Sequence, residues 1–284
     1  MAGEHATRSL VVLLGGGILA ERHWGVDAAF RRDVASCQKS VTGLLVGIAR
    51  DRGLLAAGDL VSDHLGAGWS DAPPTDEAQI RVEHLLTMSS GLDLELRRVA
   101  APGTAWLYSN HAHHVLRLVL ERVAGTGIDA LSHGWLLDPI GAEEASWYQR
   151  PGAPDPKGRK IWGLRMTARE MARVGLLVQR GGTWDGTEVI RSGTLDEVLA
   201  PSQELNPAYG QLWWLNGQAP PYPIPGAPAD LVAAYGKEDQ KIYVSRSTDL
   251  VVARLGGAGG TGGPASRASF NSVLWTALTA AAPA

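Results

Sequence analysis

Residues 34–49 read Val34-Ala35-Ser36-Cys37-Gln38-Lys39-Ser40-Val41-Thr42-Gly43-Leu44-Leu45-Val46-Gly47-Ile48-Ala49, and the rest of the chain is interpreted from this stretch. Apolar residues recur at positions 37, 41, 44, 45 and 48, the spacing of one helical face, so the stretch predicts a helix packed into a core. Ser36 lies at the first turn of this helix. Lys39 follows three residues later, and this separation places the two side chains on one face within contact distance. The sequence therefore predicts a hydroxyl beside an amine.

This pair has a chemical and a structural interpretation. A serine hydroxyl becomes a good nucleophile when a base takes its proton, and lysine is such a base only if its pKa falls toward roughly 7 to 8. The free NH groups and the positive dipole end of a helix start disfavour a nearby ammonium and can hold a developing oxyanion. In the structural alternative, Ser36 caps the helix and Lys39 extends to solvent.

Length and composition limit the class of protein. A chain of 284 residues suits one large domain or two lobes, with a substantial core. The formal charge of -3 and the lack of long basic runs argue against a nucleic-acid partner. The single cysteine, Cys37, excludes an internal disulfide and a cysteine pair for zinc or redox chemistry. No apolar run approaches the roughly 18 residues that span a bilayer, so no membrane partner is expected.

The amino-terminal stretch has two interpretations. Residues 9–20 are apolar enough to resemble the core of an export signal. Residues 10–14 and 18–22 also have the composition of two strands around a Gly15-Gly16-Gly17 turn. Glu4 and the missing basic segment before the apolar run favour the hairpin. We therefore expect a cytoplasmic protein, with secretion as the alternative.

The rest of the chain predicts a helical middle and a strand-rich end. Helices are expected over 82–88, over 112–124 and over 168–179, and a last one over about 265–280. Strands are expected over 241–245 and 250–255, joined by 246–249 as a hairpin, with a Gly-rich loop over 256–263.

These elements predict an α/β (α+β) architecture. Its antiparallel sheet is built from both chain ends, residues 1–26 and 205–284, and is flanked by helices. Residues 27–204 form an inserted, mostly helical lobe. The active helix would begin where the two lobes meet, and ligand sites favour such junctions.

A second motif follows the loop at residues 101–104. Tyr108 and Asn110 lie on a turn at the entry of the helix expected over 112–124. A tyrosine beside a lysine can pass protons between a serine and a leaving group, because a nearby positive charge lowers its pKa. Asn110 offers an amide donor and an acceptor that can orient Lys39 or a substrate carbonyl. The alternatives are a core tyrosine and an asparagine that caps the helix.

Together these motifs resemble the class C β-lactamase-like serine hydrolases. The resemblance rests on Ser36-Cys37-Gln38-Lys39 opening a buried helix, on Tyr108-Ser109-Asn110, and on a late strand around Gly236. The family includes penicillin-recognising enzymes, family VIII-type carboxylesterases and nylon-oligomer (6-aminohexanoate dimer) hydrolases. Residues 53–65, 80–92 and 103–147 resemble it too, so most of the chain is covered. The resemblance implies the penicillin-binding-protein/β-lactamase (transpeptidase-like) fold.

The resemblance also implies roles for single residues. Ser36 resembles the acylated nucleophile, Lys39 its activating amine, and Tyr108 the partner that shares the base role. Asn110 resembles the polar residue that closes the site. The backbone NH groups of Ser36 and Lys237 would form the oxyanion hole.

One element departs from the family pattern. Where the family has a Lys-Thr-Gly or His-x-Gly triplet, this chain has Ala234-Tyr235-Gly236, followed by Lys237. Gly236 would still let the strand approach the substrate closely. The groups that would bind a penicillin carboxylate are missing, so ester or amide hydrolysis is expected over efficient β-lactam hydrolysis. Lys237 could anchor an anion or point to solvent, and Asp239 stands unexplained where the family has a glycine.

Tryptophans suggest an aromatic pocket. Trp106, Trp184, Trp213 and Trp214 are expected near the cleft, and aromatic walls favour apolar acyl groups or short linear chains. Core packing is the alternative for each. The predicted substrate-binding residues are Asn110, Tyr235, Gly236, Trp106 and Trp214. Residues 206–214 resemble the nylon-oligomer-hydrolase-like branch, which favours an amidase.

The sequence thus predicts a serine hydrolase of small ester or amide substrates, with no cofactor and no metal. His111, His113 and His114 lack a carboxylate or cysteine at ligand spacing, so they are expected to border the cleft or face water. The alternatives are a penicillin-recognising sensor that does not turn over, or a weak β-lactamase or D,D-peptidase. A cell-wall peptidase would require export.

Overall fold

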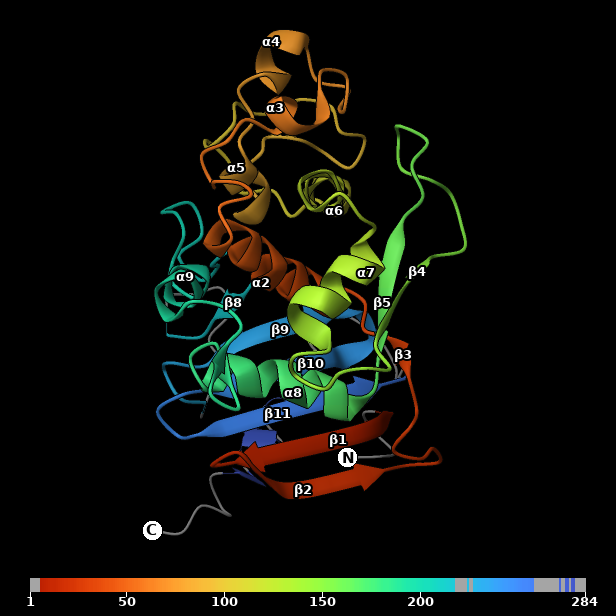
Figure 1. The fold of residues 1–284 in the computed structure, drawn as a ribbon, viewed down its shortest axis with the longest axis vertical. Helices are drawn as coiled ribbons and strands as arrows, with labels where there is room; N and C mark the ends of the chain where they lie inside the picture. Colours follow the sequence, from red (N-terminus) through yellow and green to blue (C-terminus); the bar gives the residue numbers. More distant parts are fainter. Residues whose placement is uncertain are drawn as a thin grey trace.

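A computed structural model describes residues 6–217, 224, 227–257, 271, 274–275 and 277–278. Its largest element is a six-stranded antiparallel sheet in which strands from both ends of the chain lie side by side (Figure 1). In sheet order the strands are β2 (Gly17–His23), β1 (Thr7–Leu14), β11 (Leu250–Gly256), β10 (Gln240–Ser245), β9 (Val232–Gly236) and β8 (Trp214–Leu215). This confirms the predicted fold class and the hairpin interpretation of residues 10–22.

The sheet has an apolar core on each face. Alternate side chains of a strand point to opposite faces, and in β1 Val11 and Leu13 join one buried cluster while Leu10 and Val12 join another. Strand β1 is therefore buried on both sides, which explains the continuous apolar run over residues 10–13. The apolar side chains of Ile18 and Leu19 in β2 are exposed. None of the helices described here has the length and apolar character needed to traverse a bilayer.

Two helices cover the face of the sheet on which Val11 and Leu13 lie. Helix α8 (Ala168–Gln179) packs against β1, β10 and β11, and helix α2 (Cys37–Asp51) packs against β9 and β10. Gly175 permits the close approach of α8, because a Cβ atom there would lie 2.5 Å from Val251 Cγ1. The two lobes predicted from the sequence assign α8 to the helical lobe over 27–204, whereas in the structure α8 packs against the sheet. Division of the chain into two lobes remains a prediction.

The inserted segment surrounds α2 on the side away from the sheet (Figure 1). Its helices are α3 (Val61–Leu65), α4 (Pro74–Glu77), α5 (Val82–Leu86), α6 (Asn110–Ala124), α7 (Ile128–Ser132), a π-helical turn (His133–Leu137) and α9 (Ser192–Val198). One small sheet has the strand order β3 (Arg32–Asp33), β5 (Trp162–Met166) and β4 (Ser146–Gln149). A second small sheet pairs β6 (Thr183–Trp184) with β7 (Thr187–Glu188).

Most predicted elements are confirmed with shifted ends. The helix expected over 82–88 stops at Leu86, and Met88 has a φ of 59°, which a helix cannot continue through. Helix α6 ends at Ala124, as predicted, because Gly125 adopts the left-handed conformation. Within the last predicted helix, over 265–280, the structure describes residues 271, 274–275 and 277–278, and each has helical backbone. The rest of this helix and most of the loop over 256–263 lie outside the described residues.

Candidate active site

The turn before α2 leaves the hydroxyl of Ser36 available. Ala35 has a φ of 51°, and its NH donates to Asp33 Oδ1 at 2.7 Å. Ser36 is the N-cap residue, but its side chain makes no capping hydrogen bond. Instead its Oγ accepts from Lys39 Nζ at 3.1 Å. The expected contact between hydroxyl and amine is therefore present, and the capping alternative for Ser36 is wrong.

Lys39 is a buried lysine with an unusual pKa. Its side chain is 4% exposed, and its Nζ donates to Asn110 Oδ1 at 2.8 Å as well as to Ser36. Burial, helped by the positive charge of Arg150, lowers the pKa of Lys39 to about 7, while Cys37 acts weakly in the opposite sense. Extension of Lys39 to solvent is therefore excluded. At neutral pH much of the population holds a free amine 3.1 Å from a serine hydroxyl.

The start of α6 brings Tyr108 and Asn110 to this lysine. Ser109 caps the helix by accepting from Ala112 NH at 3.2 Å, so Asn110 is not the cap and its side chain can reach Lys39. Lys39 Nζ lies 4.9 Å from the centroid of the Tyr108 ring. The structure thus brings Ser36, Lys39, Tyr108 and Asn110 together, and the role of each in catalysis remains a prediction.

The end of β9 lies directly against the start of α2. A Cβ atom at Gly236 would stand 2.4 Å from the carbonyl oxygen of Val34, so only a glycine permits this approach. Cys37 Sγ donates to the carbonyl oxygens of Ala234 and Gln240 at 3.5 and 3.3 Å. Cys37 is itself buried. These contacts place the Ala234-Tyr235-Gly236 triplet beside the Ser36 turn.

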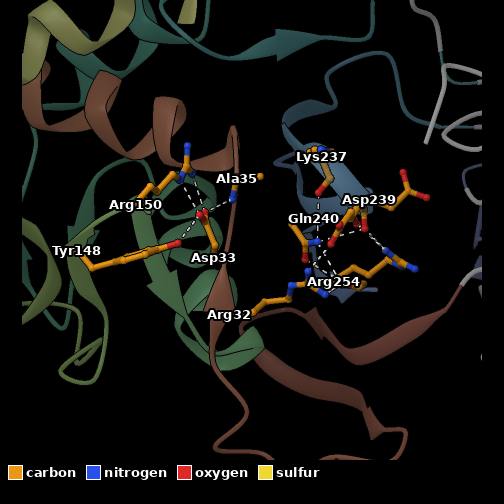
Figure 2. Close-up of polar contacts among 11 residues, drawn as sticks. Arg32, Asp33, Ala35, Tyr148, Arg150, Lys237, Asp239, Gln240 and Arg254 are labelled. Atoms are coloured by element: carbon orange, nitrogen blue, oxygen red, sulfur yellow. Dashed lines mark hydrogen bonds and ion pairs between the residues drawn. The ribbon is translucent and has the colours of Figure 1, made fainter. Parts of the chain in front are cut away.

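The turn after β9 gives a physical account of Asp239. Glu238 and Asp239 have φ values of 62° and 64°, the left-handed conformation that favours glycine. Arg254 donates to the Asp239 carbonyl at 2.6 Å, and Lys241 Nζ lies 3.1 Å from Asp239 Oδ1. Gln240 Nε2 also donates to the Lys237 carbonyl at 3.2 Å. Figure 2 shows Gln240 and Arg254 beside the turn that carries the exposed Lys237.

Aromatic rings extend from Tyr108 along the edge of the sheet. Trp214 is central to them, with ring centroids 6.3 Å from Tyr108, 6.0 Å from Trp106 and 4.8 Å from Tyr209. Its centroid lies 6.0 Å from that of Tyr235. Trp106, Tyr108, Trp214 and Tyr235 are each only partly buried. We call the rings of Trp106, Tyr108, Tyr209, Trp214 and Tyr235 the aromatic cluster.

Two of the tryptophans expected near the cleft lie elsewhere. Trp213 is fully buried in the core. Trp184 packs against the guanidinium groups of Arg173 and Arg180, at 5.6 and 5.3 Å from its ring. In both cases the alternative of packing was correct, because Trp213 belongs to the main buried core and Trp184 is partly buried against it.

For two of the three histidines of α6, the alternative that they face water is wrong, and the alternative that they border the cleft stays a prediction. His113 and His114 are 2% and 8% exposed, so they do not face water. Burial, together with the positive charge of Lys39, lowers the pKa of both side chains, that of His114 to about 3. The reason is that α6 packs this face against α2. His111 is partly exposed. Among the described residues, no group of three or more His, Cys, Asp or Glu could hold a metal ion.

Sequence reasoning missed the residues behind the Ser36 turn. The carboxylate of Asp33 accepts from Ala35, from the Tyr148 hydroxyl at 2.7 Å and from Arg150 Nε and Nη2 at 2.6 and 2.7 Å (Figure 2). Burial alone would raise the pKa of Asp33, but these hydrogen bonds and the charge of Arg150 lower it. Tyr148 and Arg150 follow Asp33 by more than a hundred residues. No local pattern could have joined them to it.

The fold is that of the penicillin-binding proteins and β-lactamases. A sequence model of the family described as Beta-lactamase matches residues 3–274, so the chain belongs to that family.

Known relatives are similar over most of the chain. The 6-aminohexanoate-dimer hydrolase of Paenarthrobacter ureafaciens is 24% identical, over 89% of this chain and 73% of the relative. A beta-lactamase from Mycobacterium bovis has a TM-score of 0.75 and 18% identity, covering 98% of this chain and 96% of its own. A D-stereospecific amidohydrolase from Streptomyces sp. has a TM-score of 0.71 and 14% identity, covering 93% of each chain. The two structures show that the fold is shared.

Proposed function

We propose that the protein is a serine hydrolase that cleaves small ester or amide bonds through an acyl-enzyme on Ser36. The observation that carries the proposal is the buried amine of Lys39. It lies 3.1 Å from Ser36 Oγ, and its pKa is lowered to about 7. A general base works best when its pKa lies near the working pH. Lys39 therefore combines the geometry and the basicity that a serine nucleophile needs.

The reaction would proceed in two stages. Lys39 takes the proton of Ser36 while the oxygen attacks the carbonyl carbon, and the backbone NH groups of Ser36 and Lys237 hold the resulting oxyanion. Tyr108, next to Lys39, shares in returning the proton to the leaving group. Water then attacks the acyl-enzyme by the same proton path and releases the acid. The close approach of Gly236 to Val34 supports this assignment of the oxyanion hole, because it fixes Lys237 near the Ser36 turn.

The substrate class follows from what surrounds these residues. In the triplet, Ala234 has only a methyl group where the family has a charged side chain that could bind a penicillin carboxylate, and Tyr235 has a ring in the aromatic cluster where the family has a small hydroxyl residue. The aromatic cluster, including Trp106, Trp214 and Tyr235, favours apolar acyl groups or short linear chains. The name of the Paenarthrobacter ureafaciens relative, a 6-aminohexanoate-dimer hydrolase, supports a linear amide. Asn110 and Gly236 complete the proposed binding residues.

The test is a panel of acyl p-nitrophenyl esters, linear amide dimers and a chromogenic cephalosporin, with the wild-type protein and Ser36→Ala. We expect turnover of esters or amides well above that of the cephalosporin. Ser36→Ala should reduce kcat/KM by about a thousandfold or more without changing the unfolding transition. Equal activity in this variant would remove Ser36 from the mechanism.

The unusual triplet also favours a second candidate, a penicillin-recognising sensor that stops at acylation. Mass spectrometry separates the two candidates after incubation with a fluorophosphonate or a penicillin. A penicillin adduct on Ser36 that persists, without turnover of any substrate in the panel, would identify a sensor. No adduct with either reagent would indicate a fold that has lost its chemistry.

A further inference from the structure

The contacts of Arg150 connect three parts of the chain behind the active helix. Its guanidinium donates to both carboxylate oxygens of Asp33, at 2.6 and 2.7 Å, and to Gln38 Oε1 at 3.3 Å. Gln38 is 1% exposed, and its Nε2 donates to the carbonyl oxygen of Trp162 at 3.2 Å. A planar guanidinium bonded on two sides has little freedom. Its positive charge is therefore fixed beside the first turn of α2.

Asp33 connects this arrangement to the nucleophile. Its Oδ1 accepts from the NH of Ala35, the residue that adopts a φ of 51° immediately before Ser36. A non-glycine residue rarely takes this conformation unless its surroundings hold it there. The direction of the Ser36 side chain depends on this turn, so Asp33 constrains where the hydroxyl points.

Arg150, which contacts Gln38 next to Lys39 in the chain, also acts on the base electrostatically. Among the charges that affect Lys39, that of Arg150 is the largest, and Cys37 opposes it weakly. The other polar groups near Lys39 come from α6 and its entry: Asn110, Tyr108, His113 and His114. Both histidines have a lowered pKa and are neutral near pH 7, so they add no charge beside Lys39. The carboxylate of Asp33 is the counter-charge of Arg150, and the charge of Arg150 still lowers the pKa of Lys39.

We propose that Asp33 and Arg150 are positioning residues of the Ser36–Lys39 pair. Asp33 holds the Ala35 turn that aims the serine hydroxyl. Arg150 places a fixed positive charge where it disfavours an ammonium at Lys39. This inference rests on the proposed function, because it assumes that Lys39 activates Ser36. It assigns roles to two residues that do not touch the reacting atoms.

The experiment measures how fast a fluorophosphonate labels Ser36 as a function of pH, by intact mass. In the wild-type protein the rate should rise with a midpoint near the pKa of Lys39, about 7. Arg150→Gln removes the charge, so the ammonium form persists to higher pH and the midpoint should rise by roughly half a pH unit or more. Arg150→Lys keeps a charge without the paired geometry, and its midpoint should lie nearer to that of the wild type.

Arg159→Gln is the matched control. Arg159 also pairs with a buried aspartate, Asp155, at 2.5 Å, but its charge is not among those that affect Lys39. Its loss should leave the midpoint unchanged. General damage to the fold would instead move the plateau rate in both arginine variants without moving the midpoint of either.

The outcomes separate this inference from the proposed function. If the wild-type protein is not labelled at Ser36, the proposed function fails and this inference fails with it. If labelling occurs but Arg150→Gln keeps the wild-type midpoint, the function stands and the inference is wrong. Asp33→Asn serves if Arg150→Gln does not fold. It should lower the plateau rate with a midpoint at or below that of the wild type, and a raised midpoint would overturn the inference.

Discussion

Among single residues, Lys39 shows most clearly that a feature useful for catalysis can lower stability. The burial that lowers its pKa also makes the folded state less stable. An unperturbed lysine has a pKa of about 10.4, whereas burial lowers that of Lys39 to about 7. Between these two values the unfolded chain binds a proton that the folded chain does not. The free energy of unfolding therefore rises with pH across this window. The contact with Ser36 was predictable from helical spacing, but the pKa depends on distant residues such as Arg150, which the sequence does not bring together.

Lys39→Met should make the protein inactive and more stable. Methionine fills similar space without burying an amine, and the expected gain at pH 7 is on the order of 2–4 kcal/mol. The gain should shrink as the pH rises from 7 toward 10, because the unfolded wild-type lysine then loses its proton. Urea unfolding at several pH values measures both effects. Ser36→Ala keeps the buried amine, so the difference in stability between this variant and the wild type should not change with pH. A Lys39→Met protein that is less stable than the wild type at pH 7 would contradict the reasoning.

At the scale of elements, the turn after β9 shows how side chains from distant strands hold an unfavourable backbone. Glu238 and Asp239 are left-handed, which costs roughly 1–2 kcal/mol for each non-glycine residue. Arg32 pairs with the Glu238 carboxylate, and Arg254 donates to the Asp239 carbonyl. The sequence located the turn and its departure from the family glycine. It could not supply the explanation, because these partners come from β3 and β11.

Asp239→Asn should separate the charge of this residue from its backbone. Asparagine tolerates the left-handed conformation, so the turn is retained. Lys241, which is fully buried, loses its carboxylate partner, and the protein should lose roughly 3 kcal/mol of stability. Asp71→Asn is the control, because Asp71 pairs with Lys157 at 2.8 Å on the surface. Its effect should stay below about 1 kcal/mol. Equal effects of the two substitutions in urea unfolding would disprove the role given to Asp239.

At the scale of the whole molecule, a central sheet built from both chain ends was predictable from its composition. Apolar, β-branched runs and glycine turns mark β1, β2, β10 and β11 in the sequence. The small sheet β3-β5-β4 was not predictable, because its strands are short and β3 and β4 lie far apart in the chain. The position of α8 on the sheet depends on Gly175, whose role only the packing reveals. Long-range packing of this kind also brings Asp33 and Arg150 together.

The candidate site depends on one contact between distant parts of the chain, which we call the seam: Val34 and Ala35 against Gly236. The NH groups proposed for the oxyanion hole belong to the residues that follow each side of it, Ser36 and Lys237. A small opening of the seam would therefore separate the two donors. Displacement of reacting groups by about 1 Å can reduce a rate by roughly a hundredfold.

Gly236→Ala tests the seam directly. The φ of Gly236 is -123°, which suits any residue, so an alanine there suffers only from its Cβ atom. That atom would stand 2.4 Å from the Val34 carbonyl oxygen and 3.3 Å from Ala35 Cβ, and β9 must move away. We expect kcat/KM to fall by about a hundredfold or more and stability to fall by roughly 1–3 kcal/mol. Gly193→Ala, in helix α9 with nothing within 4 Å of the new atom, should keep full activity. If Gly236→Ala hydrolyses the same ester at the wild-type rate, the two donors do not depend on this contact, and Lys237 is not part of the oxyanion hole.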